Sequence, residues 1–242
     1  MRADRSVQGH PVHGVAIGIL LLDTGFERLP GDIGHAMTWP FPVQYAVVRG
    51  ATGQRVSQAN AGGTLDLFVQ EAERLAAMGV AGIVTSCGFL AALQPELAAR
   101  CPVPIATSAL LQIPIVQQLL PPDRTVGVIT PLASALTPAH FYAVGVTAVP
   151  PVAGLPSDSA FVRDLMDNRS PVDVDAHRQE LLAMVDDLLR RHPEVGAIVS
   201  ECANFPVHSA AIADAFGLPV YDTYTLVTWL HAGLRPRRFP PR

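Results

Sequence analysis

The chain has 242 residues, 49% of them hydrophobic, which suits one large domain or two lobes of ordinary size and argues against a disordered chain. Its 17 basic residues are all arginine and are outnumbered by 21 acidic residues, and the formal charge of -4 argues against a nucleic-acid groove or a polybasic membrane surface. Because the sequence contains no lysine, it cannot form a Schiff base with pyridoxal phosphate or with a carbonyl substrate.

The sequence carries no recognisable targeting or metal-binding signal. Residues 1–14 are polar and lack the apolar core of a signal peptide, and no apolar run approaches the ~20 residues that a membrane span requires. We therefore expect a cytoplasmic protein with no membrane or nucleic-acid partner. Three scattered cysteines are too few for a disulfide framework, and no metal-binding or nucleotide-binding motif occurs, so we expect no metal and no cofactor.

Short apolar runs alternate with helical patterns in the first half of the chain. Residues 64–79 carry apolar side chains at helical spacing and end at Gly79, a residue typical of a helix C-terminus. The runs that we predict to be buried parallel strands are 15–23, 45–49, 82–87 and 104–108.

The second half repeats this order. Its predicted strands are 125–130, 146–152, 197–202 and 219–223, and its predicted long helix is 175–192. Pro104 opens a strand 17 residues after Cys87, Pro219 opens one 17 residues after Cys202, and Gly18 corresponds to Gly127. We therefore predict an α/β fold with two pseudo-symmetric lobes, each a parallel sheet flanked by helices, and an active site in the interlobe cleft.

Cys87 and Cys202 end equivalent strands of the two predicted lobes. A pseudo-twofold axis would bring their thiols to opposite sides of one cleft, where one removes a proton from a carbon and the other returns a proton from behind. A thiol suits this task because its ordinary pKa of about 8.5 can be lowered by a nearby helix N-terminus. A strand-end cysteine is more often a small buried hydrophobe, which is our interpretation of Cys101, whose repeat counterpart is Phe216.

The residues beside the two cysteines are candidates for substrate binding. "CGFLA" and "CANFP" are predicted strand-to-helix turns, whose free N–H groups can hold a carboxylate or carbonyl oxygen as it gains enolate character. Asn204 and Thr130 offer side-chain donors, although both residue types are also common at ordinary turns. Arg28, in the loop 27–35, is predicted either to pair with a substrate carboxylate or to be neutralised by Asp32. The predicted substrate-binding residues are Gly88, Phe89, Thr130, Ala203, Asn204 and Arg28.

With these residues the sequence resembles the aspartate/glutamate racemase superfamily, which includes hydantoin racemase, arylmalonate decarboxylase and maleate isomerase. The resemblance spans nearly the whole chain and rests on the duplicated α/β lobes and on the strand-end cysteines in "TSCGF" and "SECANFP". It implies a cofactor-independent reaction at a carbon next to a carboxylate or carbonyl, with Cys87 and Cys202 as the base/acid pair. It also implies that the last helix packs on the first lobe, which gives lobes of 1–118 plus 225–242 and of 119–224.

The sequence departs from the pattern of glutamate racemases after both cysteines. Gly88-Phe89 stands where those enzymes typically have Asn-Thr, and Ala203-Asn204 stands where they have Thr-His. The resemblance therefore favours a substrate less polar than glutamate. The decarboxylase branch normally has one catalytic cysteine and a tyrosine where this chain has Leu132, which favours racemisation over decarboxylation.

Three hypotheses follow for the function. The leading one is a racemase or epimerase acting by two thiols on an amino acid or a derivative such as a hydantoin. The alternative is an enzyme similar to arylmalonate decarboxylase or maleate isomerase that relies mainly on Cys202, and the third is a non-catalytic protein that binds a ligand in the same cleft. In the enzyme hypotheses the partner is a small carboxylate or carbonyl compound, and the formation of a homo-oligomer stays open.

Overall fold

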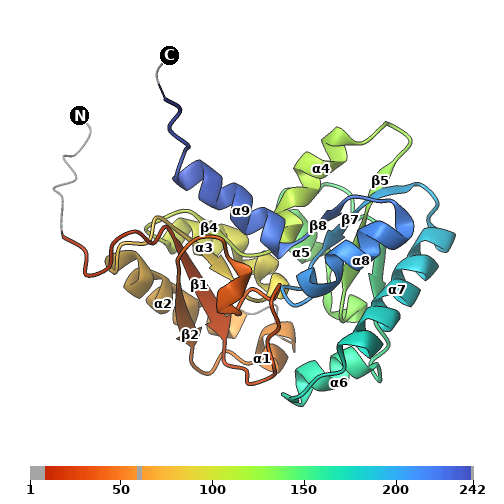
Figure 1. Ribbon diagram of the computed structural model, residues 1–242, viewed down its shortest axis with the longest axis horizontal. Coiled ribbons are helices and arrows are strands. Elements are labelled where there is room, and N and C mark those ends of the chain that lie inside the picture. Colours follow the sequence, from red (N-terminus) through yellow and green to blue (C-terminus); the bar gives the residue numbers. More distant parts are fainter. Residues whose placement is uncertain (1–8, 59–61, 241–242) are drawn as a thin grey trace.

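The computed structural model describes residues 9–58 and 62–240 of the chain and contains two α/β lobes side by side (Figure 1). Most of the polar start that we interpreted as lacking a signal peptide is in residues 1–8, outside the described residues. The described strands form two four-stranded parallel sheets with the orders β2-β1-β3-β4 and β6-β5-β7-β8. The two orders are the same when the second set is renumbered, so the predicted duplication and the predicted fold class are confirmed.

The elements of each lobe alternate between strands and helices. In chain order, the first half of the chain contains β1 (Ile17–Leu22), β2 (Val43–Val48), α1 (Gly53–Gln58), α2 (Leu65–Ala77), β3 (Gly82–Thr85), α3 (Gln94–Arg100), β4 (Ile105–Ala106) and α4 (Ile113–Leu119). The second half contains β5 (Thr125–Thr130), α5 (Pro138–Ala143), β6 (Val152–Gly154), α6 (Ala160–Met166), α7 (Val174–Arg191), β7 (Val195–Ser200), α8 (Pro206–Phe216), β8 (Val220–Tyr221) and α9 (Thr223–Leu234). Short 3₁₀ segments are η1 (Ala36–Thr38), η2 (Gly62–Thr64), η3 (Gly88–Leu93), η4 (Ala109–Gln112) and η5 (Ala133–Ala135).

The central strands are apolar throughout because both faces of each sheet are covered. In β1, Ile17 and Ile19 pack in one core cluster, whereas Leu20 and Leu22 pack in another on the opposite face. A strand that alternates between two dry faces appears in the sequence as an uninterrupted apolar run, as "IGILLL" does.

Gly18 and Gly127 have equivalent roles in the two lobes. A Cβ atom on Gly18 would lie 2.9 Å from Leu75 Cδ1 of α2, and one on Gly127 would lie 3.1 Å from Leu188 Cδ2 of α7. Each glycine therefore lets a helix leucine pack closely on the first strand of its sheet.

Helices α4 and α9 are exchanged between the lobes. α4 follows the last strand of the first sheet, yet Ile113 and Val116 pack in a core cluster with residues of β5 and β7. α9 follows the last strand of the second sheet, yet Leu226 and Val227 pack with residues of β1 and β3. The exchange ties the two lobes together, and the division of the chain into 1–118 plus 225–242 and 119–224 stays a prediction.

One predicted strand was wrong in its position. The run 146–152 was predicted to be a strand, but β6 covers only Val152–Gly154. Pro150 and Pro151 lack the N–H group that a strand needs to donate, so pairing begins after them. The strands β3 and β7 end at Thr85 and Ser200, two residues before the cysteines that we placed at their ends.

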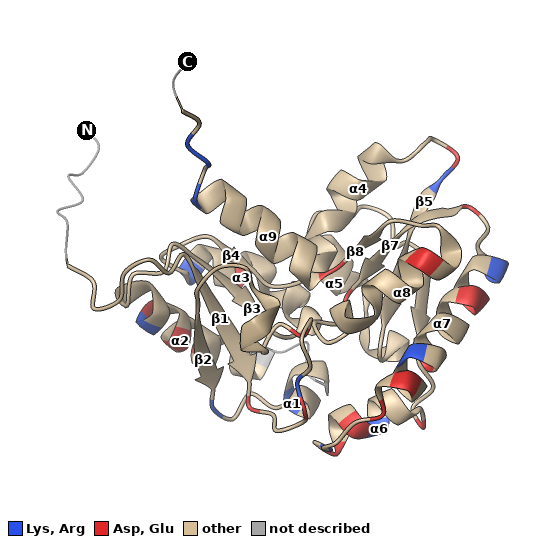
Figure 2. Ribbon diagram, viewed as in Figure 1, with Lys and Arg blue, Asp and Glu red and all other residues tan. Residues whose placement is uncertain are grey.

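Charged side chains gather on the outer helices, chiefly α2, α6 and α7, whereas α9 carries none over most of its length (Figure 2). None of the helices in residues 9–58 and 62–240 combines the length and the apolar character that crossing a membrane requires.

Candidate active site

A cavity of about 780 Å³ lies between the lobes, beyond the carboxyl ends of β1, β3 and β7, and we call it the interlobe cavity. This is the position at which open parallel sheets bind ligands. Seven of the eight predicted site residues line it: Arg28, Cys87, Gly88, Phe89, Cys202, Ala203 and Asn204. Thr24, Phe26, Leu132, Met166 and Glu201 also belong to the lining.

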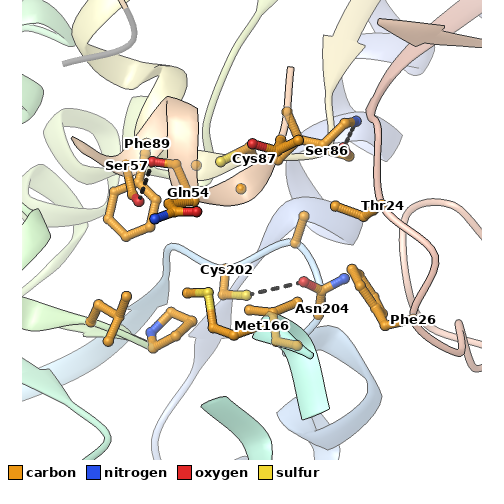
Figure 3. A pocket seen from close by; sticks show the side chains of 18 of the residues that line it. Thr24, Phe26, Gln54, Ser57, Ser86, Cys87, Phe89, Met166, Cys202 and Asn204 are labelled. Carbon is orange, nitrogen blue, oxygen red and sulfur yellow. Dashed lines mark hydrogen bonds between the residues drawn. The ribbon is translucent and has the colours of Figure 1, made fainter. Parts of the chain in front are cut away.

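The two thiols come from opposite walls of the interlobe cavity (Figure 3). Cys87 is the N-cap residue of η3, and Cys202 lies in the turn that leads into α8. The fold thus gives both thiols the same local setting, at the start of a strand-to-helix turn in equivalent parts of the two lobes. A small molecule in the cavity would have one thiol on each side.

Both thiols are protonated near neutral pH, because their pKa values are raised. Burial and, to a smaller extent, the nearby Glu201 carboxylate raise the pKa of Cys87 to about 12, although the backbone N–H groups of Phe89 and Leu90 act in the opposite direction. Burial and the same Glu201 carboxylate also raise the pKa of Cys202 well above its ordinary value, against the N–H of Asn204. Because a thiolate is the reactive form, the base requires a change in its surroundings before it can act.

Glu201 is a functional candidate that our sequence analysis missed. It is 1% exposed and lies directly before Cys202 in the chain. Burial raises its pKa to about 7, and the Thr130 hydroxyl, which donates to Glu201 Oε2 at 2.7 Å, partly offsets that rise. The feature of the sequence that could have identified Glu201 is a single acidic residue directly after a largely apolar strand, in "AIVSEC".

Gly88 is the place where the first lobe touches Glu201. A Cβ atom on Gly88 would lie 2.1 Å from Glu201 Oε1 and 2.4 Å from the Glu201 carbonyl oxygen. No side chain fits there, so glycine is required for the two lobes to meet at this edge of the cavity. The contact also places the Glu201 carboxyl group next to the Cys87 turn.

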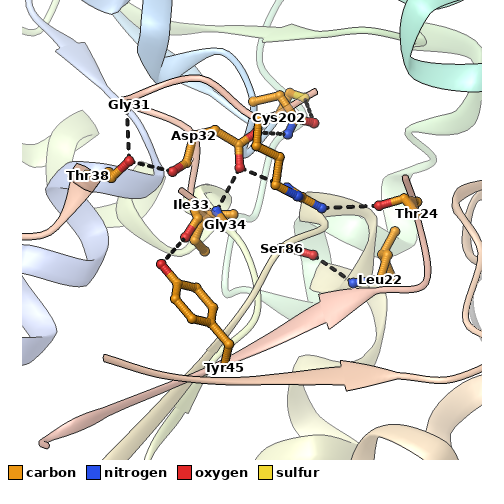
Figure 4. A network of polar contacts seen from close by, with 12 residues as sticks. Leu22, Thr24, Gly31, Asp32, Ile33, Gly34, Thr38, Tyr45, Ser86 and Cys202 are labelled. Atoms are coloured by element: carbon orange, nitrogen blue, oxygen red, sulfur yellow. Dashed lines mark hydrogen bonds and ion pairs between the residues drawn. The ribbon is translucent and has the colours of Figure 1, made fainter. Parts of the chain in front are cut away.

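Arg28 lines the cavity and bonds to Asp32 and Thr24, which belong to the polar network of Figure 4. Its Nη1 donates to Asp32 Oδ1 at 2.8 Å and its Nη2 donates to Thr24 Oγ1 at 3.1 Å. The guanidinium lies 4.5 Å from the centre of the Phe26 ring. Arg28 is therefore paired with Asp32, as the second sequence interpretation has it, and it also lines the cavity. Its pairing with a substrate carboxylate stays a prediction.

Asn204 connects this network to the second thiol. Its Nδ2 donates to Asp32 Oδ2, and Cys202 Sγ lies 3.5 Å from its Oδ1. Asp32 is buried and also accepts from the backbone N–H of Gly34 at 2.7 Å. Asn204 is thereby fixed between the two lobes, with its carbonyl oxygen directed at the thiol.

Thr130 is the predicted site residue that the structure does not bring to the cavity. It is fully buried, and its hydroxyl is engaged by Glu201. Its position is behind the Glu201 carboxyl group, which it orients. Among the described residues no three His, Cys, Asp or Glu side chains are grouped so that they would hold a metal ion.

The fold matches solved enzyme structures over nearly its whole length. A variant of arylmalonate decarboxylase superposes with a TM-score of 0.61 at 14% identity, covering 94% of this chain and 97% of that one. Glutamate racemase of Bacillus anthracis gives a TM-score of 0.59 at 13% identity over 91% of this chain and 83% of that one. The chain has the aspartate/glutamate racemase fold. Glutamate racemase of Thermus thermophilus, bound to β-chloro-D-alanine, is similar as well, with a TM-score of 0.55 and 20% identity over 95% of this chain and 86% of that one.

Curated sequences similar to this chain carry a different name. The dimethylsulfoniopropionate lyase of Durusdinium sp. clade D is 24% identical over 219 residues, which are 86% of this chain and 71% of that protein. Dimethylsulfoniopropionate lyase 6 of Emiliania huxleyi is 26% identical over 239 residues, 94% of this chain and 61% of that protein. The chain thus spans about two thirds of the length of these relatives. No family model matches the chain. The proteins with similar sequences or structures are enzymes, and they include lyases, a decarboxylase and racemases.

Proposed function

We propose that this protein is a cofactor-independent carbon–sulfur lyase that removes the proton next to a carboxylate in a sulfoniopropionate, the class to which dimethylsulfoniopropionate belongs. The observation that carries the proposal is that two cysteines from equivalent turns of the two lobes line one interlobe cavity. The relatives named dimethylsulfoniopropionate lyase, matched over 86% and 94% of this chain, support the choice of substrate class.

The proposed reaction is an elimination. A thiolate takes the proton from the carbon next to the carboxylate, the electron pair of that C–H bond forms a double bond to the β-carbon, and the bond from the β-carbon to sulfur breaks. The sulfonium sulfur keeps the bonding pair and leaves as a neutral dialkyl sulfide, while the carbon part becomes an acrylate. The proton held by the thiol then passes to solvent, which restores the base.

The described residues offer a place for each part of such a substrate. The guanidinium of Arg28 and the backbone N–H groups after Cys87 and Cys202 are the proposed partners of the carboxylate, whose negative charge grows as the proton leaves. The apolar side chains of Phe89 and Met166 provide a surface for the alkyl groups on sulfur. Binding that displaces water from the cavity strengthens these interactions.

Racemisation is the second candidate, and the duplicated setting of the thiols favours it. Elimination needs one base, whereas inversion of a carbon centre needs a group on each face, and Cys87 and Cys202 lie on opposite walls (Figure 3). Both reactions begin with the same proton transfer. The prediction of an isomerase acting on an amino acid or a hydantoin therefore stays open beside the lyase proposal, as does the decarboxylase-like or isomerase-like alternative that relies mainly on Cys202.

Turnover assays on the purified protein distinguish these reactions. Dimethylsulfoniopropionate is supplied and dimethyl sulfide is measured by headspace gas chromatography, while amino acids, hydantoins and arylmalonates are incubated in heavy water and analysed by chiral chromatography. We expect sulfide release to fall at least 100-fold in the variant that replaces the thiol acting as the base, either Cys87→Ser or Cys202→Ser. Cys101→Ser is the matched control, because this partly buried cysteine lies outside the cavity, and it should keep full activity.

Two results of these assays would overturn the lyase proposal. Loss of optical activity that requires both thiols, without sulfide release, would replace the lyase by a racemase. Undiminished turnover by a protein lacking both Cys87 and Cys202 would exclude thiol chemistry in either reaction.

A further inference from the structure

Glu201 is a buried carboxyl group without a cationic partner among the described residues. It is 1% exposed, it forms none of the ion pairs between described side chains, and its hydrogen bond comes from the neutral Thr130 hydroxyl. A buried carboxylate is unstable unless a positive group or several donors compensate it. Glu201 nevertheless lines the interlobe cavity, so a cationic group of a bound molecule has room to approach its carboxylate.

The cavity contains no described cation that is free to compensate Glu201. Arg28 is the one positively charged side chain among the described lining residues, and it is paired with Asp32 at 2.8 Å. The remaining acidic lining residue, Asp23, is partly exposed and paired with Arg49. The unbalanced charge of the cavity is therefore the Glu201 carboxylate, which raises the pKa of both thiols.

The surroundings suit a cation that carries alkyl groups and has no N–H donor. Phe26, Phe89 and Met166 line the same cavity (Figure 3), and aromatic faces and a polarizable thioether attract such cations without requiring hydrogen bonds. Phe26 already lies against the Arg28 guanidinium, which leaves the Phe89 ring and the thioether for a ligand.

We propose that Glu201 determines substrate specificity by binding a permanently cationic group, a sulfonium or quaternary ammonium, on the carbon next to the reacting one. This inference rests on the proposed function and extends it to a residue that selects zwitterions over simple carboxylates. A bound cation also cancels the Glu201 charge that opposes ionisation of Cys87 and Cys202. The substrate thereby helps to generate its own base.

A pair of isosteric probes tests the inference without turnover. 3-(Trimethylammonio)propanoate carries a quaternary nitrogen where 4,4-dimethylpentanoate carries a quaternary carbon, and both have the same shape and the same carboxylate. Their binding to the full-length protein is measured by isothermal titration calorimetry. We expect the cationic probe to bind at least about tenfold more tightly than its neutral isostere. Glu201→Gln should reduce this preference to below about twofold, while the matched acidic control Asp23→Asn should keep it.

Each outcome decides the inference separately from the proposed function. Equal binding of the two probes to the unmodified protein, or binding of neither, overturns it even if the thiol variants lose sulfide release. Because this comparison needs no variant, it also holds if Glu201→Gln fails to fold. A preference for the cationic probe that persists in folded Glu201→Gln assigns the cation to another group and overturns the role of Glu201. Absence of turnover with the expected preference intact would overturn the lyase proposal alone.

Discussion

Replacing Gly88 by alanine tests the contact on which the geometry of the site depends. The added Cβ would lie 2.1 Å from Glu201 Oε1, 2.6 Å from Glu201 Cδ and 2.4 Å from the Glu201 carbonyl oxygen. A side chain can rotate away from a methyl group, but the carbonyl oxygen is part of the backbone. The substitution therefore has to separate the Cys87 turn from the end of β7.

The expected magnitude follows from the cost of overpacking. Inserting a methyl group into a packed site typically destabilises a protein by ~1–3 kcal/mol, and a clash with backbone belongs at the upper end. For a chain of 242 residues, ~3 kcal/mol corresponds to a fall in Tm of roughly 6–12 °C. Because the displaced groups carry both thiols and Glu201, turnover should fall by at least about tenfold even below the lowered Tm.

Differential scanning calorimetry and the sulfide-release assay measure the two effects on the same preparation. Gly233→Ala is a suitable control, since a Cβ on that α9 glycine would meet nothing within 4 Å. In the last turn of α9 this change should stabilise the protein by up to about 1 kcal/mol or leave it unchanged. Combining Gly88→Ala with Glu201→Gln should not restore stability, because the carbonyl oxygen stays in place.

A Gly88→Ala protein with unchanged Tm and activity would refute this reasoning, because it would mean that the lobes do not meet at this glycine. A full rescue by Glu201→Gln would show that only the side chain opposes the methyl group. Either result would require a different account of how Glu201 is buried.

Three further predictions follow from the same region. Glu201 binds a proton more tightly in the folded protein, with a pKa of about 7 against 4.5 in the unfolded chain. The free energy of unfolding should therefore fall by roughly 3 kcal/mol as pH rises between those values. Urea unfolding at pH 5 and pH 8 should show this fall in the unmodified protein and not in Glu201→Gln. In Glu201→Gln, iodoacetamide should alkylate Cys87 faster at pH 8, because loss of the carboxylate lowers the pKa of the thiol. An unchanged alkylation rate, measured by mass spectrometry, would contradict the effect of Glu201 on the pKa of Cys87. Asn204→Asp replaces the donor to Asp32 by a second carboxylate, so it should destabilise the protein by ~2 kcal/mol at pH 7. The loss should be smaller at pH 4, where one carboxyl group takes a proton. Equal losses of stability at both pH values, measured by urea unfolding, would argue against the contact between Asn204 and Asp32.

The sequence was sufficient to predict the sheet architecture, for an identifiable reason. Strands that are dry on both faces appear as uninterrupted apolar runs, and equal spacing from each cysteine to the following proline revealed the repeat. The packing contacts between elements that are distant in the sequence were harder to predict. Nothing in the local pattern of α4 indicates which sheet the helix covers, so its packing on the second sheet appears only in the structure. The packing of α9 on the first sheet was implied by the resemblance to a family and not by the local pattern of that helix.

The candidate site likewise has a part that the sequence predicts and a part that only the structure shows. The paired cysteines and their turns were found because each has an equivalent in the other half of the chain. Glu201 has no such equivalent, since Ser86 occupies its place in the first lobe and accepts a hydrogen bond from the Leu22 N–H. An acidic residue directly after a strand normally faces water, whereas Glu201 is buried and lies against Gly88 of the other lobe. The burial of Glu201 is therefore a property of the assembled lobes and not of "AIVSEC" itself.

The electrostatics of the interlobe cavity constrain every mechanism that uses the thiols. With the pKa of Cys87 at about 12, a thiolate is scarce near neutral pH, and desolvation by a purely apolar ligand would make it scarcer. Two changes act in the favourable direction: neutralisation of Glu201 and the arrival of positive charge. A sulfonium substrate supplies both at once and places its acidic C–H bond within the same small molecule. A dianionic substrate such as a malonate would instead bring negative charge toward Glu201 and both thiols. Of the reactions proposed for this site, elimination from a zwitterion is therefore the one that this arrangement of charges assists most directly.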